Sequence, residues 1–320
     1  MRLVARLAST IVALAVLGPV AAQDVNLPLP VAELEQMLRH EPLRIVAAEI
    51  SRPKAKGDIT LKAEVAFGDR PPLRVKLRKA VPGGEEFNNV PRYDLAAYEL
   101  QKLFIDPAEY VVPPTALRMI PLADFRQYSP DVLPTFRESA EVLAVVQAWL
   151  QQIKVIADVF DPALFETDAV YARHIGQLNV LTHAIAHGDS NVGNFLISRA
   201  TTGPRVFSID HGVAFASAQS DRGKLWQVMR VNRLPADTVA RLRALTDHTL
   251  HERLGVLAQW QLQDGRYVAV PADGNLSPQR GIRREDGILQ MGLTRSEIGA
   301  VWRRLSRLLK EVDAGRIETY

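Results

Sequence analysis

Short runs of alternating apolar and polar residues mark the region after residue 42. The runs Leu43–Ile50, Ile59–Phe67 and Leu73–Ala80 are rich in strand-forming residues, and the turn-prone segments SRPKAKGD and GDRPP separate them. Alternation with a period of two residues is typical of a strand with one buried face. The three runs therefore predict an antiparallel β-meander.

Helical periodicity flanks this meander. Apolar residues at helical spacing predict a short helix over Val31–Arg39 and a longer one over Tyr93–Phe104. The second helix begins after Pro91, a residue type favoured in the first turn of a helix. The segment Val111–Leu122 returns to strand character after its pair of prolines. The expected order is thus helix, three strands, helix, strand.

Beyond residue 122 the pattern becomes mainly helical. Helices are expected over Glu138–Ile156, Ala169–Ala186 and Ala236–Leu257 and again from Thr294, which forms a capping-box sequence with Glu297, whereas Gln261–Met291 is expected to be irregular. This change of pattern predicts an α+β fold with a β-rich part at residues 43–122 and a helical part at residues 123–320.

The first residues have the pattern of an export signal. Arg2 and Arg6 precede an apolar run that ends at Val20-Ala21-Ala22, a small-residue cleavage sequence. The run is shorter than the about 18–20 residues that a spanning helix needs, so an uncleaved membrane anchor is the weaker alternative. We expect a signal peptide at residues 1–22, a leader with a short helix at residues 23–42, and a secreted or periplasmic protein without a membrane span after cleavage.

Composition narrows the possible chemistry. The chain has 320 residues, of which 47% are hydrophobic and 23% charged, and these values exclude wholesale disorder, coiled coil and collagen. The formal net charge of +3 gives no basic surface field of the kind that nucleic-acid binding needs. Because the chain has no cysteine, thiolate metal sites, disulfides and cysteine nucleophiles are excluded. Any chemistry must use oxygen and nitrogen atoms.

One polar segment carries the strongest chemical signal. In HGDSNVGN, Asp189 and Asn194 are five residues apart, and Gly188 and Gly193 allow a tight loop. The apolar runs FLIS and RVFSI, joined by a Thr-Thr-Gly-Pro turn, predict a hairpin that brings the chain back to Asp210. Two carboxylates and an amide oxygen are hard ligands of the kind that magnesium prefers when substrate phosphates also hold it. The alternative for Asp189 is a purely structural role in the loop.

A candidate cation for such phosphates lies in the third predicted strand. The two-residue period of LRVKLRKA places Lys76 on the same face as Arg74 and Arg78. Lys79 is the other candidate for the phosphate-binding lysine. The helix that follows offers Asp94 and Glu99, either of which could pair with the lysine ammonium. The alternative to a functional role is that the lysines lie on a solvated face of the strand and that the two acids are exposed on the helix.

The order of these motifs resembles the protein-kinase-like superfamily in its atypical branch. HGDSNVGN is similar to the catalytic loop of aminoglycoside phosphotransferases, and SIDHG is similar to the metal-binding Asp-Phe-Gly segment. The stretch from ITLKAEVAF to VVPPT is similar to secretory-pathway kinases of the Golgi casein kinase type, and phosphoinositide kinases share the motif order. The resemblance covers roughly residues 45–215. It implies a two-lobed fold, with a β-rich N-lobe and a helical C-lobe, that binds ATP with Mg²⁺ or Mn²⁺ in the cleft.

The resemblance also implies a role for each matching residue. Asp189 matches the catalytic base, and Asn194 and Asp210 match the metal ligands. Lys76 matches the lysine that binds the phosphates. These four positions make up the core of the expected active site.

Three positions depart from the pattern of the family. Asp94, which is favoured over Glu99 as the partner of the lysine, stands where glutamate is usual. The glycine-rich loop that covers the nucleotide is reduced to SRPKAKGD, in which Gly57 is the only glycine. SIDHG keeps the metal acid and the glycine but lacks the phenylalanine. None of these changes removes a residue that the chemistry requires.

The expected function is therefore an exported phosphotransferase that moves the γ-phosphoryl of ATP to a hydroxyl of a protein, glycan, lipid or small molecule. One alternative is a pseudokinase that binds a nucleotide or a partner protein without turnover, because a periplasm holds little ATP. The other is a metal-binding adaptor whose helical part docks a partner through Trp260 and Trp302.

Overall fold

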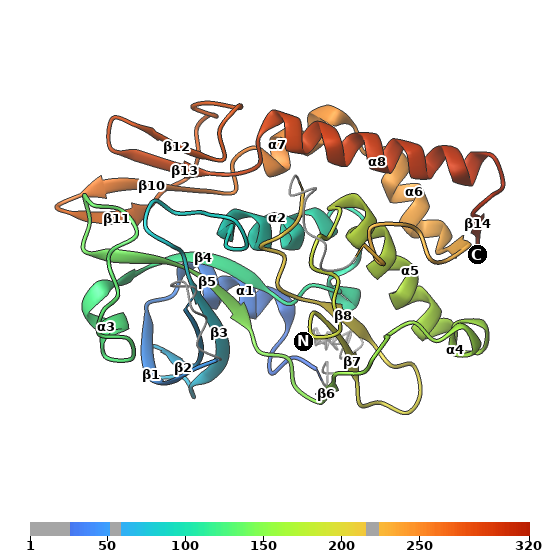
Figure 1. The fold of residues 1–320 in the computed structure, drawn as a ribbon, viewed down its shortest axis with the longest axis horizontal. Coiled ribbons are helices and arrows are strands. Elements are labelled where there is room, and N and C mark those ends of the chain that lie inside the picture. The colour runs from blue at the N-terminus through green and yellow to red at the C-terminus, as the bar shows by residue number, and fades with distance from the viewer. Residues whose placement is uncertain (1–25, 52–58, 216–223) are drawn as a thin grey trace, which may run out of the picture.

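The computed structural model describes residues 26–51, 59–215 and 224–320, which form a mixed α+β fold (Figure 1). Its main layer is an antiparallel sheet of five strands in the order β1-β2-β3-β5-β4. The strands are β1 (Leu43–Ile50), β2 (Thr60–Phe67), β3 (Leu73–Lys79), β4 (Thr115–Pro121) and β5 (Glu141–Ala148). The meander predicted from the first three runs is confirmed, because β1 pairs with β2 and β2 with β3, both antiparallel.

Two helices pack on this sheet where the periodicity predicts them. Helix α1 (Val31–His40) buries Leu34, Met37 and Leu38 in one apolar core with the sheet. Helix α2 (Pro91–Gln101) follows β3 and is buried along almost its whole length in a second core. The expected signal peptide and the loop that contains Gly57 lie outside the described residues.

Strand β5 corrects the sequence-based prediction, which placed a helix over residues 138–156. Every residue of EVLAVVQA is buried, because alternate side chains pack into the core with α1 and into the core with α2. A strand that is covered on both faces is apolar at every position and shows no period of two. The boundary expected at residue 122 is also wrong for the sheet, since β5 lies between β3 and β4.

The helices of the C-terminal half agree with the pattern in part. Helix α5 fills the predicted range and α8 begins at the predicted capping box of Thr294. The single helix expected over residues 236–257 is instead two helices, because Thr246 caps a new helix after the extended Leu245. The bounds are α3 (Leu122–Arg126), α4 (Pro162–Thr167), α5 (Ala169–Ala184), α6 (Ala236–Ala244), α7 (Asp247–Leu254) and α8 (Arg295–Asp313).

A second antiparallel sheet replaces the irregular segment that was expected over residues 261–291. Its order is β11-β10-β13-β12, and its strands are β10 (Ala258–Gln263), β11 (Arg266–Ala269), β12 (Ile282–Glu285) and β13 (Ile288–Met291). The pairs Gln263–Arg266 and Glu285–Ile288 close two-residue turns, each made of Asp-Gly with positive φ at both residues. Asp-Gly between apolar runs is a strong hairpin signal, and it is present twice in the sequence.

Short strands complete the fold. A three-stranded sheet of β6 (Ile153–Lys154), β7 (Phe195–Ser198) and β8 (Val206–Ser208) includes the predicted FLIS–RVFSI hairpin. A 3₁₀ turn, Pro107–Glu109, precedes β4, and β9 (Arg233–Leu234) pairs in parallel with β14 (Glu318–Thr319). Among the described residues, no helix is both long enough and apolar enough to cross a bilayer.

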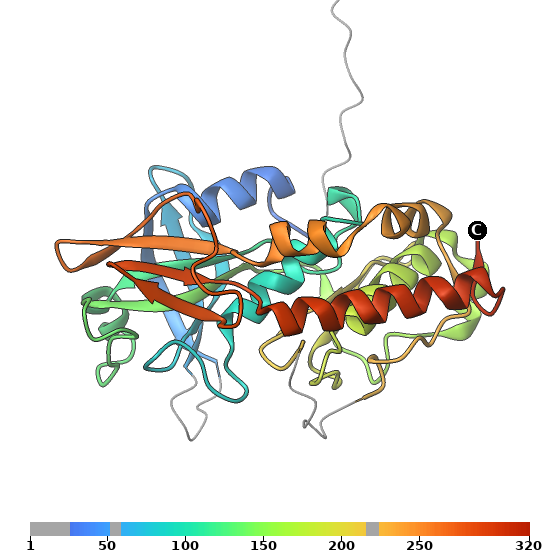
Figure 2. The same ribbon diagram turned by 90° about the horizontal axis from the view of Figure 1, so that it is seen from above.

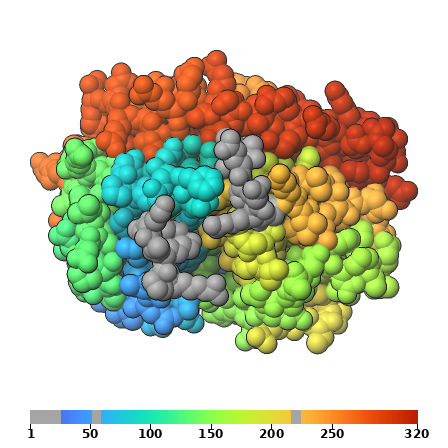
Figure 3. All heavy atoms as spheres, in the orientation of Figure 1, coloured from blue at the N-terminus to red at the C-terminus, as the bar shows by residue number. Residues whose placement is uncertain are grey.

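The C-terminal elements run along one side of the molecule. In Figure 2, α8 extends from the four-stranded sheet toward the far end of the helical part. In Figure 3, the residues of α8 and of the four-stranded sheet, coloured orange and red, form one layer above the five-stranded sheet and the other helices. Residues of α2, α5 and α8 share one apolar core, so this layer is packed against the same helix that follows β3.

Candidate functional site

The β7–β8 hairpin brings Asn194 and Asp210 to the same end. Phe195 pairs with Ser208, and the N–H of Ile209 donates to the carbonyl of Asn194 at 3.0 Å. One strand, a turn and a return strand therefore separate the two residues, as the spacing predicts. Asp210 has φ 62°, in the left-handed region, which is uncommon for a residue with a Cβ and is often found at functional sites.

The loop before the hairpin is built around Asp189. The side-chain amide of Asn194 donates to the Asp189 carbonyl at 2.8 Å and to Asp189 Oδ2 at 3.1 Å. Asn191 Nδ2 donates to Asp189 Oδ1 at 2.6 Å. Both carboxylate oxygens are thus oriented by amide donors, and Asp189 itself is half-buried at the loop surface. His187 also helps to hold the loop, since its Nδ1 accepts from the Asp189 N–H at 3.4 Å.

The β3 face that was expected to carry cations points toward Asp210. Lys76 Nζ lies 3.6 Å from Asp210 Oδ1, and Arg78 Nη1 donates to the same oxygen at 2.6 Å. Lys79 is buried on the other face, where its ammonium donates to the Ala80 carbonyl at 2.9 Å. The structure therefore brings Lys76, and not Lys79, to the end of the hairpin.

The pairing predicted between Lys76 and Asp94 is corrected by the structure. Asp94 Oδ2 lies 3.6 Å from Arg78 Nη1, and Asp94 Oδ1 accepts the backbone N–H of His211 at 2.9 Å. In the part of the chain that the structure describes, no ion pair within 4.0 Å joins Lys76 to Asp94. The guanidinium of Arg78 has several N–H donors, so it can contact Asp94 and Asp210 together. Aspartate, which is shorter than the usual glutamate, can therefore serve at position 94.

Glu99 takes no part in this cluster. Its carboxylate binds Arg39, and it lies 2.9 Å from Lys102 Nζ on the side of α2 that faces α1. Asp94, and not Glu99, is therefore the acid of α2 that lies beside the cations of β3, although its partner is Arg78.

Burial controls the protonation of the groups around Asp94. Burial raises the pKa of Asp94, while the charges of Arg78 and Lys76 oppose that shift. Burial lowers the pKa of His187 to about 4 and holds the pKa of His211 well below its usual value. The two imidazole rings lie 5.0 Å apart between centroids and are neutral at pH 7. The positive charge of the cluster therefore comes from Lys76 and Arg78.

A narrow apolar cavity opens beside Lys76. Its volume is about 70 Å³, and its walls come from β3, the end of β5 and the segment after it, and the hairpin. The lining residues are Lys76, Pro113, Gln147, Ala148, Trp149, Leu150, Ile153, Leu196 and Ile209. A flat group whose apolar part entered this cavity would have its polar end next to Lys76.

The oxygen ligands of the site are too few to hold a divalent cation by themselves. They fit a cation that phosphates also bind. Asp210 offers one carboxylate and Asn194 one amide oxygen, and magnesium is commonly held by one or two carboxylates together with substrate phosphates. Among the described residues no group of three or more His, Asp or Glu side chains could hold a metal ion.

Sequence reasoning missed two members of the cluster, Arg78 and His211. The period of β3 places Arg78 beside Lys76, so its position on that face was predictable, but its contact with both acids was not. Gly212 has a related role, since a Cβ at this position would lie 2.6 Å from Arg78 Nη1. The glycine of SIDHG therefore leaves room for the guanidinium.

Comparison with known proteins gives no match, either to the model of a protein family or to a curated protein sequence.

Proposed function

We propose that this protein is an exported phosphotransferase with a two-lobed, protein-kinase-like fold, which moves the γ-phosphoryl of ATP to a hydroxyl group. The strand order β1-β2-β3-β5-β4, with α2 between β3 and β4, supports the N-lobe of such a fold. The helices and the β7–β8 hairpin that follow support a C-lobe. The signal-peptide pattern of the first 22 residues supports export.

The observation that carries this proposal is the meeting of two cations with a polar loop. Lys76 and Arg78 lie within 3.6 Å and 2.6 Å of Asp210 Oδ1, and Asn194 and Asp189 lie in the loop that leads into the same hairpin. Phosphoryl transfer needs cations for the phosphates, oxygen ligands for a metal and an acid beside the acceptor. All three kinds of group are supplied by residues that are distant in sequence, from β3 and from the hairpin.

Each side chain then has a defined task. Lys76 and Arg78 would bind phosphate oxygens, and the apolar cavity beside Lys76 would take the edge of the nucleotide base. Asp210 and Asn194 would hold Mg²⁺ or Mn²⁺, which supplies charge neutralisation of the phosphates. Asp189, oriented by the amides of Asn191 and Asn194, would position the acceptor hydroxyl and take its proton.

Replacement of Asp189 by asparagine tests the proposal most directly. Asp189→Asn is nearly isosteric but cannot accept the proton, so nucleotide affinity should stay within a few-fold while transfer, or ATP hydrolysis, falls by roughly 10²–10⁴. The measurement is ATP turnover and ATP binding of the chain from Gln23, with magnesium and manganese in parallel. If the wild type and the variant turn over ATP equally, Asp189 is not the base.

A second candidate function is nucleotide binding without turnover. It is favoured by the short contact between Arg78 and Asp210, because a guanidinium at 2.6 Å already neutralises the acid that would hold the metal. In that case the protein should bind ATP equally well with and without magnesium and show no turnover. Of the two tryptophans in the adaptor alternative, Trp260 is buried in the core and offers no docking surface, whereas Trp302 is half-buried.

A further inference from the structure

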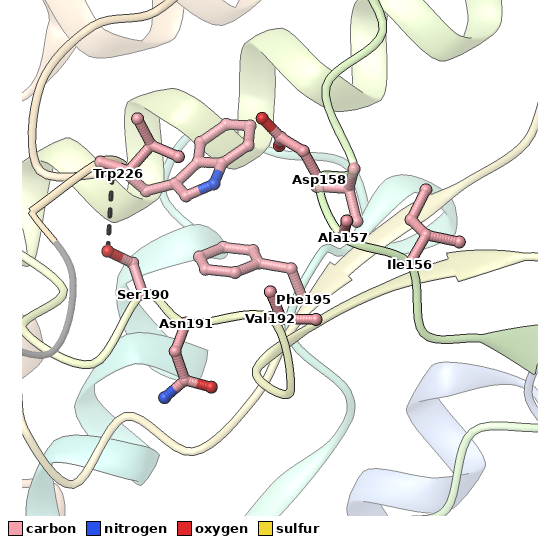
Figure 4. A pocket seen from close by; sticks show the side chains of 10 residues that line it. Ile156, Ala157, Asp158, Ser190, Asn191, Val192, Phe195 and Trp226 are labelled. Atoms are coloured by element: carbon pink, nitrogen blue, oxygen red, sulfur yellow. Dashed lines mark hydrogen bonds between the residues drawn. The ribbon is translucent and has the colours of Figure 1, made fainter.

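A second pocket lies against the loop that carries Asp189 (Figure 4). Its volume is about 480 Å³, within the range of about 300–1,000 Å³ that is usual for small-molecule sites. It is lined by residues from the segment after β6, from the loop that leads into β7, and from the segment before β9: Ile156, Ala157, Asp158, Val159, Ser190, Asn191, Val192, Phe195, Leu225 and Trp226.

The pocket is joined to Asp189 by the chain itself and by a hydrogen bond. Ser190, Asn191 and Val192, which follow Asp189 directly, form one wall. Asn191 both lines the pocket and donates from Nδ2 to Asp189 Oδ1 at 2.6 Å. A molecule held against this wall would therefore lie beside the loop that carries Asp189.

The lining selects for uncharged, apolar groups. The indole of Trp226 stacks on Phe195 with ring centroids 5.2 Å apart, and Val192 and Leu225 are half-exposed at the pocket. Among the described residues that line it, Asp158 is the one with a charge, and its two oxygens accept from Arg230 at 2.9 and 2.6 Å. Because these described residues include no cation, an anionic molecule would be desolvated beside them without a partner.

The wall that carries Trp226 is held in place before any ligand binds. Asn179 Oδ1 accepts the backbone N–H of Arg230 at 2.6 Å, and Asn179 Nδ2 donates to the Val228 carbonyl at 2.8 Å. The guanidinium of Arg230 lies 4.5 Å from the Trp226 ring centroid. A wall that is already ordered loses little conformational entropy on binding, which favours affinity.

From this geometry we infer that the pocket is the acceptor subsite, and that the acceptor is a small, uncharged alcohol with an aromatic or aliphatic body. The inference rests on the proposed function and names its acceptor. In the reaction, the alcohol oxygen forms a bond to the γ-phosphorus of ATP while the bond from that phosphorus to the bridging oxygen of ADP breaks. The hydroxyl proton passes to Asp189 and then to solvent, so the products are a phosphate monoester and ADP.

Binding of two matched probes tests the chemistry of the pocket. We would titrate the protein with 2-naphthalenemethanol and with its anionic analogue, 6-(hydroxymethyl)-2-naphthoate, and follow binding by ligand-observed NMR without nucleotide. The neutral alcohol should bind at least tenfold more tightly, because the carboxylate finds no cation in the lining. Equal affinity for the two probes, or no binding of the alcohol, would overturn the inference.

A pair of matched variants tests the location. Val192→Asp places a charge in the lining, whereas Val155→Asp makes the same change at a valine of similar exposure, 53% against 50%, that does not line the pocket. The first variant should weaken alcohol binding at least tenfold and the second by less than twofold. An equal loss in both would mean that the alcohol binds elsewhere.

The role as acceptor is tested separately from the proposed function. With ATP and magnesium, the wild type should form naphthylmethyl phosphate, detected by ³¹P NMR, and Asp189→Asn should bind the alcohol but form no product. If the wild type hydrolyses ATP but neither binds nor phosphorylates the alcohol, the acceptor inference fails and the proposed function stands. If the alcohol binds but ATP does not, both the phosphotransferase and the acceptor role are rejected.

Discussion

Lys76 and Lys79 lie on opposite faces of β3, and this difference decides which of them reaches the end of the β7–β8 hairpin. Lys76 shares its face with Arg78 and reaches Asp210, whereas Lys79 is buried and donates to a backbone carbonyl. Since the side chains of a strand alternate, a shift by one residue would have exchanged their roles.

We therefore predict that Lys76→Met and Lys79→Met have unequal effects on ATP binding. Loss of a charged hydrogen bond to a phosphate, about 1.5–3 kcal/mol, corresponds to roughly tenfold to hundredfold weaker binding for Lys76→Met. Lys79→Met should change the affinity by less than about threefold. Isothermal titration calorimetry on both folded variants measures the difference, and similar losses would reject the assignment of Lys76.

The guanidinium of Arg78 makes Gly212 a second informative position. A methyl group at Gly212 would lie 2.6 Å from Arg78 Nη1, and the guanidinium cannot move aside without leaving Asp210 and the carbonyl of Asn88. We expect Gly212→Ala to lower the thermal unfolding midpoint and to weaken ATP binding. Gly274→Ala is the control, because nothing lies within 4 Å of the added carbon there.

The positions of single site residues were predictable where their spacing along the chain determines which residues come together. Asp189, Asn194 and Asp210 lie close along the chain, and one short hairpin joins them. The contact between Arg78 and Asp94 was not predictable, because it depends on how far α2 lies from β3 and on which side chain can span that gap. A sequence motif gives neither the distance between the two elements nor the side chain that spans it.

Among whole elements, β5 and the second sheet show where periodicity stops being informative. The EVLAVVQA strand is buried on both faces, so its apolar run looks the same as a buried helix segment. The second sheet was predictable from its two Asp-Gly turns, although its strands are only four to six residues long. The amphipathic helices α1 and α8, by contrast, follow their patterns closely.

Helix α8 is tied to α2 by a buried ion pair. Glu297, in the first turn of α8, accepts from Arg92 Nη1 at 2.6 Å and from Arg92 Nη2 at 3.0 Å, and the hydroxyl of Tyr93 donates to it at 2.5 Å. The Tyr93 ring lies 5.1 Å from the ring of Phe215, in the segment that follows Asp210. The two residues that bind Glu297 thus precede Asp94 directly in α2.

We predict that Glu297→Gln destabilises the protein strongly. The change breaks the buried ion pair and leaves Arg92 with the half-buried Glu85, whose Oε2 lies 2.7 Å from Arg92 Nε. Breaking a buried ion pair costs up to about 3–5 kcal/mol of unfolding free energy. Glu311→Gln, on the same helix, is the control, because Glu311 lies at the surface beside Arg316 and its loss should change the unfolding midpoint little. Urea denaturation of both variants at pH 7 measures the effect.

The same pair predicts a pH dependence. Arg92 and Tyr93 hold the pKa of Glu297 below its ordinary value of 4.5, although burial opposes this shift. A depressed pKa in the folded state contributes stability above the unfolded value, and this contribution is lost as the pH falls through the folded value. The stability difference between wild type and Glu297→Gln should therefore shrink below pH 4.5. A difference that stays constant from pH 7 to acid would contradict the ion pair.

At the scale of the whole molecule, the site lies where the sheet meets the helical part, and its charges determine which ligands it can hold. Lys76 and Arg78 surround the carboxylate of Asp210, so a free divalent cation would meet two positive charges before it reached an acid. A nucleotide brings four or so negative oxygens that reverse this balance.

We predict that magnesium alone does not bind, while ATP and magnesium bind together. Thermal unfolding should show no shift with magnesium, a small shift with ATP, and a larger shift with both, because the phosphates compensate the cations of β3. Asp210→Ala should abolish the extra shift from magnesium but retain part of the shift from ATP. A shift with magnesium alone would place a metal site elsewhere in the chain.

The contact between Glu297 and Arg92 joins residues that are 205 positions apart, and this distance has a consequence for biosynthesis. When α2 leaves the ribosome, the helix that will hold it has not yet been made. Arg92 and Tyr93 can reach their buried partner only after α8 has been synthesised. The first turn of α2 therefore stays without this ion pair throughout translation, until the long C-terminal helix has folded.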